Sequence, residues 1–277
     1  MLGIIFNFIL AVVKMAAGIL GHSYALVADA IESTADIFTS IVVWFGLKVA
    51  AKAPDEDHPY GHGKAEPLTA IFVSLALVGA AVLIAKESIH NIVTPHELPK
   101  WFTLVVLGLV IIIKESLYRH VNHTGDELGS MAVKSDAQHH RADVITSLTA
   151  FVGIGVALIG GKGYESADDW AALVAAIIIV YNSVHIFRPA FSEIMDKAPP
   201  RELVEDVKAI AMTVPGVKGI DKCFVRKMGL DYYIDIHVIV DGNLSVRDGH
   251  RIGHEVKDKL RQRRAWVSDV LTHIEPM

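Results

Sequence analysis

The sequence predicts an α-helical membrane protein that ends in a small α+β domain. Hydrophobic residues make up 52% of the 277 residues and the mean hydropathy is +0.40, which is too apolar for an ordinary soluble domain. The apolar stretches are confined to the first two thirds of the chain. We therefore predict a membrane domain over residues 1–196 and a soluble domain over residues 197–277.

Apolar stretches that are free or nearly free of charge predict six transmembrane helices. They cover residues 1–28 (interrupted by Lys14), 37–47, 68–85, 101–113, 144–161 and 170–187. Several are shorter than the ~20 residues that cross a bilayer, so flanking polar residues must extend these helices. The first stretch has neither a basic leading segment nor a cleavage site, which favours a retained helix over a signal peptide.

Basic residues between the predicted helices set the orientation. The junction at residues 18–23 has none, whereas the second and fourth junctions contain Lys52, Lys64, Lys114, Arg119 and Lys134. By the positive-inside rule these even-numbered junctions are cytoplasmic. We predict a multi-pass membrane protein with both termini in the cytoplasm, located in the cell or inner membrane if the source is prokaryotic.

The soluble domain follows a proline-containing linker at residues 197–200. Helical spacing predicts helices over residues 203–214 and 246–264, and strand patterns cover residues 217–227, 232–240 and 267–274. In the second strand, Ile234, Ile236, Val238 and Val240 share one face, while Tyr233, Asp235 and His237 share the other. The order αββαβ predicts a two-layer, ferredoxin-like α+β domain.

A polar motif occurs twice within the apolar region. Residues 29–36 and 136–143 align without a gap and share Asp, Ala, Ala and Asp at equivalent positions. On a helix, Asp136, His139 and Asp143 lie on one face. An ionised side chain at mid-bilayer costs about 2.5–3.5 kcal/mol. The two polar faces should therefore face each other or share a cation.

These faces predict a site for a divalent metal ion. Residues four apart on two facing helices would place three carboxylate oxygens and one imidazole nitrogen around a point, a set that suits Zn²⁺ and tolerates Fe²⁺, Mn²⁺ or Co²⁺. The predicted ligands are Glu32, Asp36, His139 and Asp143. The alternative is that they lie in the membrane interface and cap helix ends. Asp29 and Asp136 either support these ligands or act as N-terminal helix charges.

Other features limit the function classes. The net charge of −5 argues against nucleic acid as a partner, and the single cysteine, Cys223, excludes a disulfide framework and a cysteine-rich zinc site. The chain has neither a phosphate-binding glycine-rich loop nor a phosphorylatable Asp-Lys-Thr-Gly segment. Because metal binding displaces protons from histidine and carboxylate ligands, coupling of metal movement to a proton gradient is the economical hypothesis.

Two further groups of histidines and acids are candidate metal sites. The polar loop at residues 55–64 contains Asp55, His58 and His62, which predict either a second metal site or a solvated turn. In the soluble domain the candidates are His237, His250, His254, His273 and Glu275. Each is by itself an ordinary surface residue, and their convergence would make a third site.

The chain resembles the cation diffusion facilitators, homodimeric transporters that export divalent metal ions from the cytoplasm in exchange for protons. The resemblance rests on residues 22–30 with Glu32 and Asp36, on the loop at residues 58–66, on residues 136–143 and on the αββαβ tail. It covers essentially the whole chain. It implies a homodimer in a lipid bilayer that carries Zn²⁺, or next Fe²⁺, as cargo and has no resident cofactor.

The resemblance also implies roles for individual residues. The transport site would be Glu32, Asp36, His139 and Asp143, the loop site Asp55, His58 and His62, and the cytoplasmic site, near the interface of two tails, His237, His250, His273 and Glu275. The family usually has Asp or His where Glu32 stands, and often Asp where Glu275 stands. Lys64 would pair with Asp196, although such a pair is equally a surface ion pair worth under about 1 kcal/mol.

Two other function classes remain. A membrane-embedded metalloenzyme would need an activated water at an open coordination position and usually a His-Glu-x-x-His helix, which the sequence lacks. A metal sensor without transport would need a signalling module, and the tail is too short to contain one besides its binding fold.

Overall fold

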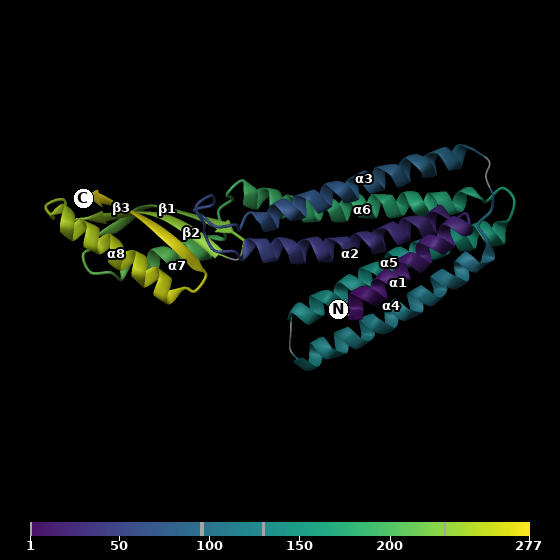
Figure 1. Cartoon of the computed structure of the whole chain (residues 1–277), viewed down its shortest axis with the longest axis horizontal. Helices are drawn as coiled ribbons and strands as arrows, with labels where there is room; N and C mark the ends of the chain where they lie inside the picture. The colour runs from purple at the N-terminus through teal and green to yellow at the C-terminus, as the bar shows by residue number, and fades with distance from the viewer. Residues whose placement is uncertain (1, 95–96, 129–130, 230) are drawn as a thin grey trace. The chain divides into compact units, whose positions relative to one another are not determined.

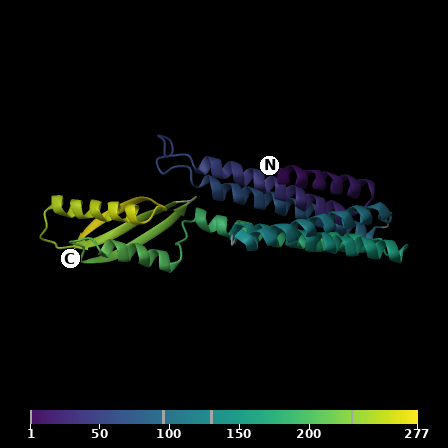
Figure 2. The ribbon, with the colours of Figure 1, turned by 90° about the horizontal axis from the view of Figure 1, so that it is seen from below.

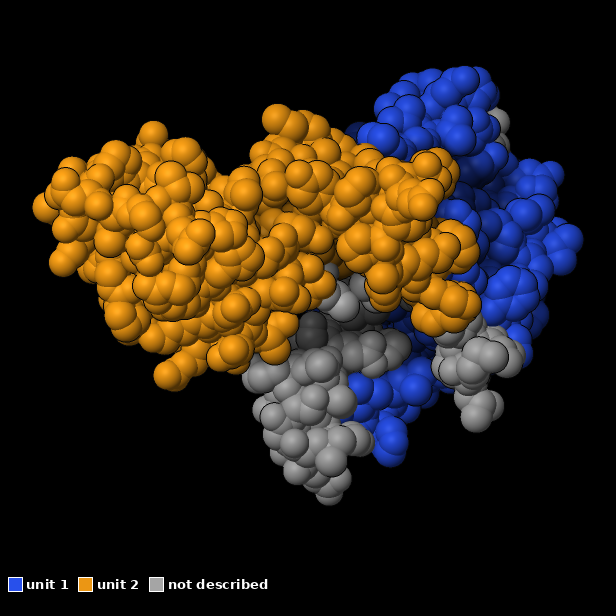
Figure 3. All heavy atoms as spheres, turned by 60° about the vertical axis from the view of Figure 1, so that its left-hand side comes forward, with its two compact units in different colours: residues 1–41, 73–186 blue, residues 42–72, 187–277 orange. Residues whose placement is uncertain are grey.

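The computed structural model describes residues 2–94, 97–128, 131–229 and 231–277 (Figure 1). Within these ranges the backbone alone is described for residues 2–6, 39, 40, 43, 47, 124–128, 131–140 and 142. The chain divides into two compact units (Figure 3). The first consists of residues 1–41 and 73–186, and the second of residues 42–72 and 187–277.

Long helices occupy the apolar region, and each contains one of the predicted apolar stretches or most of it. They are α1 (Leu2–Leu20), α2 (Tyr24–Ala50), α3 (Ala65–Val93), α4 (Trp101–Leu128), α5 (Met131–Gly160) and α6 (Ser166–Ile194). Flanking polar residues do extend the helices, as the short apolar stretches required. Among the described residues, four helical segments are long and apolar enough to cross a membrane: Ala65–Val93, Trp101–His123, Asp143–Gly160 and Ser166–Ile194.

Small residues let the helices of the first unit pack closely. Helices α4 and α5 lie side by side along their length (Figure 1). Between α5 and α6, a Cβ atom at Gly153 would lie 2.3 Å from the Cβ of Ala171, so glycine is required for this approach. On the outside, large apolar side chains such as Ile159 and Ile177 are exposed, which suits a surface that faces lipid.

The start of α2 is fixed by a side chain from α6. The carboxylate of Asp168 accepts hydrogen bonds from the Ser23 hydroxyl at 2.7 Å and from the backbone N–H groups of Tyr24 and Ala25 at 2.6 and 3.3 Å. These N–H groups have no partner within their own helix. Asp168 therefore caps α2 and sets its position against α6, a role that sequence reasoning missed.

The C-terminal part of the second unit has the predicted order αββαβ. Its elements are α7 (Arg201–Met212), β1 (Gly219–Met228), β2 (Asp231–Val240), α8 (Val246–Arg263) and β3 (Val267–Pro276) (Figure 2). The sheet order is β1-β2-β3, with β1 antiparallel and β3 parallel to β2.

One face of this sheet is covered by helices. The predicted apolar face of β2, from Ile234 to Val240, is buried together with Val256 and Leu260 of α8. A Cβ atom at Gly253 would lie 2.8 Å from Oγ1 of Thr272, so this glycine lets α8 pack closely on β3. Since side chains alternate along a strand, His237 lies on the opposite face.

Candidate metal sites

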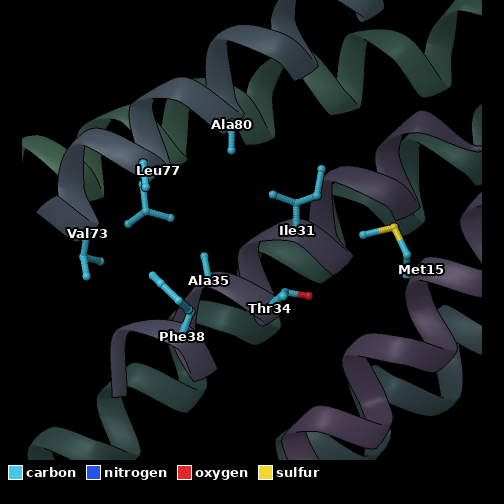
Figure 4. A pocket seen from close by; sticks show the side chains of 9 residues that line it. Met15, Ile31, Thr34, Ala35, Phe38, Val73, Leu77 and Ala80 are labelled. Carbon is cyan, nitrogen blue, oxygen red and sulfur yellow. The ribbon is translucent and has the colours of Figure 1, made fainter. Parts of the chain in front are cut away.

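The two faces of α2 differ in polarity. Ile31, Ala35 and Phe38 line an apolar cavity of about 260 Å³ that also contacts α3 and Met15 of α1 (Figure 4). Thr34 lies on the same face, and its hydroxyl is satisfied within the helix by the carbonyl of Ala30, at 2.8 Å. The opposite face presents the polar residues Asp29, Glu32, Ser33 and Asp36. The spacing that predicted a polar face on this helix is therefore retained in three dimensions.

A buried lysine from α1 binds this polar face. Lys14 is 0% exposed, and its Nζ lies 2.5 Å from Oδ2 of Asp29. The same Nζ donates to the Ser33 hydroxyl at 3.0 Å and to the Ser147 hydroxyl of α5 at 3.4 Å. Ser147 in turn donates to Asp29 at 2.7 Å. This network joins α1, α2 and α5 and places Asp29 in a structural ion pair.

A second buried lysine, Lys114 of α4, contacts the polar face of α5. Its Nζ lies 2.8 Å from Oδ2 of Asp143, and the two side chains are 6% and 11% exposed. The sequence interpretation that counted Lys114, Arg119 and Lys134 in a loop was wrong, because the first two lie inside α4 and Lys134 lies inside α5. Little in the sequence indicated the burial of Lys114, because it follows the apolar stretch at residues 101–113 and is itself followed by Glu115.

The acids of α2 and α5 form one electrostatic cluster. Glu32 interacts with Asp36 and Asp29 on its own helix and with Asp143 of α5. Lys114 interacts with the same cluster. The cation that the two polar faces were expected to share is therefore supplied in part by the chain itself. The side chains of the predicted residues Asp136 and His139 lie outside the described residues.

The loop residues Asp55, His58 and His62 lie together in the second unit. Their ligand atoms are all within 4.8 Å of one another. The two oxygens of Asp55 lie 3.2 Å from Nδ1 of His58 and 3.4 Å from Nε2 of His62. The backbone N–H of His58 donates to Asp55 and lowers the pKa of this carboxyl group. The Nδ1 atom of His62 is buried without a hydrogen-bond partner, so this ring has an unused nitrogen.

Three of the four predicted C-terminal ligands lie together on the face of the sheet opposite α8. The parallel register pairs His237 with His273, and their ring centroids are 4.8 Å apart. Oε1 of Glu275 lies 2.7 Å from Nδ1 of His237 and 3.8 Å from Nε2 of His273. His250 is not part of this group, because α8 packs on the opposite face. Its ring instead contacts that of His254, with centroids 4.5 Å apart.

The junction between α6 and the C-terminal domain contains two ion pairs. Nζ of Lys64 lies 2.9 Å from Oδ1 of Asp196, the pair that the family resemblance implied. Nζ of Lys227 lies 2.8 Å from Glu193, which also accepts a hydrogen bond from the backbone N–H of Gly229 at 3.1 Å. Partial burial alone would lower the pKa of Lys227, but its hydrogen bond to Glu193 and the charge of that group raise it.

The combination of apolar helices, buried acids and grouped histidines defines a multi-pass membrane protein equipped to bind metal ions. Two family models match this chain. The cation efflux transmembrane domain matches residues 1–195, and the cation efflux protein cytoplasmic domain matches residues 199–277. The chain belongs to the cation diffusion facilitators, a family of divalent metal cation efflux transporters.

Several curated proteins are similar over the full chain. The manganese efflux system protein MneP of Bacillus subtilis is 33% identical over 100% of this chain and 94% of its own length. Metal tolerance protein C1 of Arabidopsis thaliana is 33% identical over 99% of this chain and 61% of its own length. The magnetosome protein MamB of Paramagnetospirillum magneticum is 29% identical over 95% of this chain and 88% of its own length.

Solved structures match the C-terminal domain. A MamM-CTD structure is 24% identical and covers 28% of this chain and 100% of its own length, with a TM-score of 0.27.

Proposed function

We propose that this chain carries a divalent metal ion across the membrane at a site formed by α2 and α5. The ligands are Glu32, Asp36, His139 and Asp143. The observation that carries the proposal is the electrostatic cluster of Glu32, Asp36 and Asp143, contributed by two helices of an apolar bundle. Concentrating carboxylates in such surroundings is costly unless a cation binds them.

The proposal places all six long helices across the bilayer and both termini in the cytoplasm. Lys52 and Lys64 remain in the second junction, and the first junction has no basic residue. The tail has the element order αββαβ and a three-stranded sheet. We propose that it is a ferredoxin-like domain and that two tails pair in a twofold homodimer. The matching cytoplasmic domain of the cation efflux family supports this assembly.

The donor set leaves several first-row metals open. Three carboxylate oxygens with one imidazole suit Zn²⁺ and Fe²⁺, and oxygen-rich sets also suit Mn²⁺. The manganese efflux protein among the relatives adds weight to Mn²⁺. We therefore propose Zn²⁺, Fe²⁺ and Mn²⁺ as the cargo to be compared first.

Protons are the proposed counter-substrate. The carboxylates and imidazole must lose their protons before they bind a metal ion. A site that binds either cargo or protons and faces the two sides of the membrane alternately will exchange them. No resident cofactor enters this scheme.

The loop and tail sites are proposed to regulate transport. Metal at His237, His273 and Glu275 would neutralise acidic charge on the sheet face opposite α8. His250 would reach such a site only from another copy of the chain. Asp55, His58 and His62 would bind metal in the α2–α3 loop. Binding there shifts the population of conformers rather than performing chemistry.

Transport can be tested with the purified protein in proteoliposomes. Uptake of Zn²⁺, Fe²⁺, Mn²⁺, Co²⁺ and Cd²⁺ is measured with and without an imposed pH gradient, with Glu32→Asp as a comparison for metal preference. We expect saturable uptake of at least one metal. This uptake should be faster when the compartment that receives the metal ion is the more acidic one. Uptake indifferent to the gradient would reject proton exchange. A metal-dependent hydrolytic activity without uptake would favour the metalloenzyme, and binding without uptake would favour the sensor.

A further inference from the structure

The two buried lysines of the first unit have different surroundings. Lys14 contacts one carboxylate and two hydroxyl groups, from Asp29, Ser33 and Ser147. An ammonium group has three donors, so this coordination uses all of them. Lys114 makes its described hydrogen bond to Asp143 alone, at 2.8 Å. Among the described residues, Lys14 is therefore held by three groups, whereas Lys114 has one hydrogen-bond partner.

That partner is a proposed ligand of the transported ion. The ammonium of Lys114 occupies one lone-pair position of Oδ2 of Asp143, and its positive charge opposes a metal ion at the same carboxylate. Lys114 also interacts with Asp29 and Asp36 of α2. The ammonium group is thus a chain-borne cation placed within the acidic cluster.

We infer that Lys114 is a tethered counterion that holds Asp143 while the transport site is empty and leaves Asp143 when a metal ion binds. Lys14 keeps its contacts throughout. The inference rests on the proposed transport function and identifies a residue that competes with cargo. Lys114 acts as a charged ammonium in both states, so no proton is transferred to or from it.

Such a counterion stabilises the buried carboxylate of a transport site that holds no metal ion. A buried carboxylate without a partner is strongly destabilising. The flexible four-carbon stem of lysine lets its head move between positions without a change in the helices. Competition by Lys114 also weakens metal binding and so favours release of the ion.

The first test measures metal affinity in full-length protein, by equilibrium dialysis with Mn²⁺ and with Zn²⁺. Lys114→Met should bind at least one of these metals about tenfold more tightly than wild type, because the competing positive charge is gone. Asp143→Asn should bind more weakly. Unchanged or weakened binding by folded Lys114→Met would overturn the inference.

The second test uses the wild-type protein and so does not depend on whether Lys114→Met folds. Amines are acetylated with and without saturating Mn²⁺ or Zn²⁺, and the extent at each lysine is read by mass spectrometry. Acetylation of Lys114 should accelerate at least about fivefold with metal, while Lys14 serves as the internal control and stays protected. Asp143→Asn should expose Lys114 to acetylation without metal. Equal rates at Lys114 with and without metal would overturn the inference.

The two proposals fail in distinguishable ways. If Asp143→Asn binds both metals as tightly as wild type, the proposed transport site is rejected. If Asp143→Asn weakens binding but Lys114→Met does not strengthen it and acetylation does not change, the site stands and only the counterion role is rejected.

Discussion

Cys223 shows how one side chain takes its chemistry from its position in a strand. It lies in β1, half-buried, and packs against the buried apolar core of the domain. Burial raises the pKa of its thiol to about 11. Since the thiolate is the reactive form, Cys223 should be inert near neutral pH.

Alkylation rates check this expectation directly, because Cys223 is the chain's single cysteine. The rate with iodoacetamide in native protein should keep rising between pH 8 and 10 without a plateau. In urea-unfolded protein the rate should instead level off as the pH passes the ordinary thiol pKa of about 8.5. A native profile that levels off at the same pH as the unfolded one would show that burial does not control this thiol.

Asp206 and Arg264 give the C-terminal domain a pH-dependent ion pair. Nε and Nη2 of Arg264 lie 2.6 and 2.5 Å from the two oxygens of Asp206. The hydrogen bonds from Arg264 hold the pKa of Asp206 below its usual value. Because the folded-state pKa is lowered, the pair stabilises the fold above the ordinary Asp pKa and loses this effect as the pH falls through the lowered value.

The expected contribution is small, since both side chains are partly exposed to solvent. At pH 7, the urea midpoint of the C-terminal domain should be lower in Asp206→Asn than in wild type. Between pH 5 and 3, this midpoint should fall less in the variant than in wild type. Asp258→Asn, which neutralises an exposed acid on α8, is the control. Identical acid sensitivity in wild type and Asp206→Asn would contradict the role of this pair.

Two glycines in the membrane helices differ in how much space surrounds them. A Cβ atom at Gly153 of α5 would lie 2.3 Å from the Cβ of Ala171 and 3.0 Å from the carbonyl oxygen of Ala167, both in α6. A Cβ atom at Gly79 of α3 would meet nothing within 4 Å. The two positions are therefore a matched pair for substitution.

Gly153→Ala should destabilise the membrane domain by about 1–3 kcal/mol, because α5 and α6 must separate to admit the methyl group. Gly79→Ala should be neutral or stabilising by up to about 1 kcal/mol, since alanine favours the helix. Thermal unfolding in detergent measures both. Equal effects of the two substitutions would mean that the α5–α6 contact does not limit stability.

The sequence predicted which residues share one face of a helix or strand, but not which residues of other helices contact that face. The spacing of Glu32 and Asp36 was enough to place them on one face of α2, and the alternation of β2 separated His237 from the core. Helical periodicity does not say which other helix supplies a counterion. Lys14, Lys114 and Asp168 were therefore missed in their roles, because each acts on a residue far away in the sequence.

Helix ends show a similar limit. Hydropathy marked the apolar parts of the helices, but α4 continues through Glu115 and Arg119 to Leu128. These two residues form an ion pair one turn apart, at 2.7 Å, which satisfies both charges on the helix surface. From the end of the apolar stretch alone, these residues were predicted to lie in a loop.

At the scale of the whole molecule, charge is distributed according to what surrounds it. In the described part of the first unit, the acids Asp29 and Asp143 are paired with lysines from neighbouring helices. In the second unit, His58 and His237 each gather with another histidine and an acid near solvent. One chain thus combines a buried acidic cluster with more accessible clusters of histidines and acids.

Metal uptake by Asp36→Asn tests whether the acids of α2 and α5 carry the cargo. Proteoliposomes containing equal amounts of folded wild type, Asp36→Asn and the control Asp258→Asn are compared for the metal that wild type transports fastest. We expect at least a tenfold loss of uptake in Asp36→Asn, because a ligand of the ion is gone, and wild-type uptake in the control. Wild-type uptake by Asp36→Asn would contradict this role of the acids.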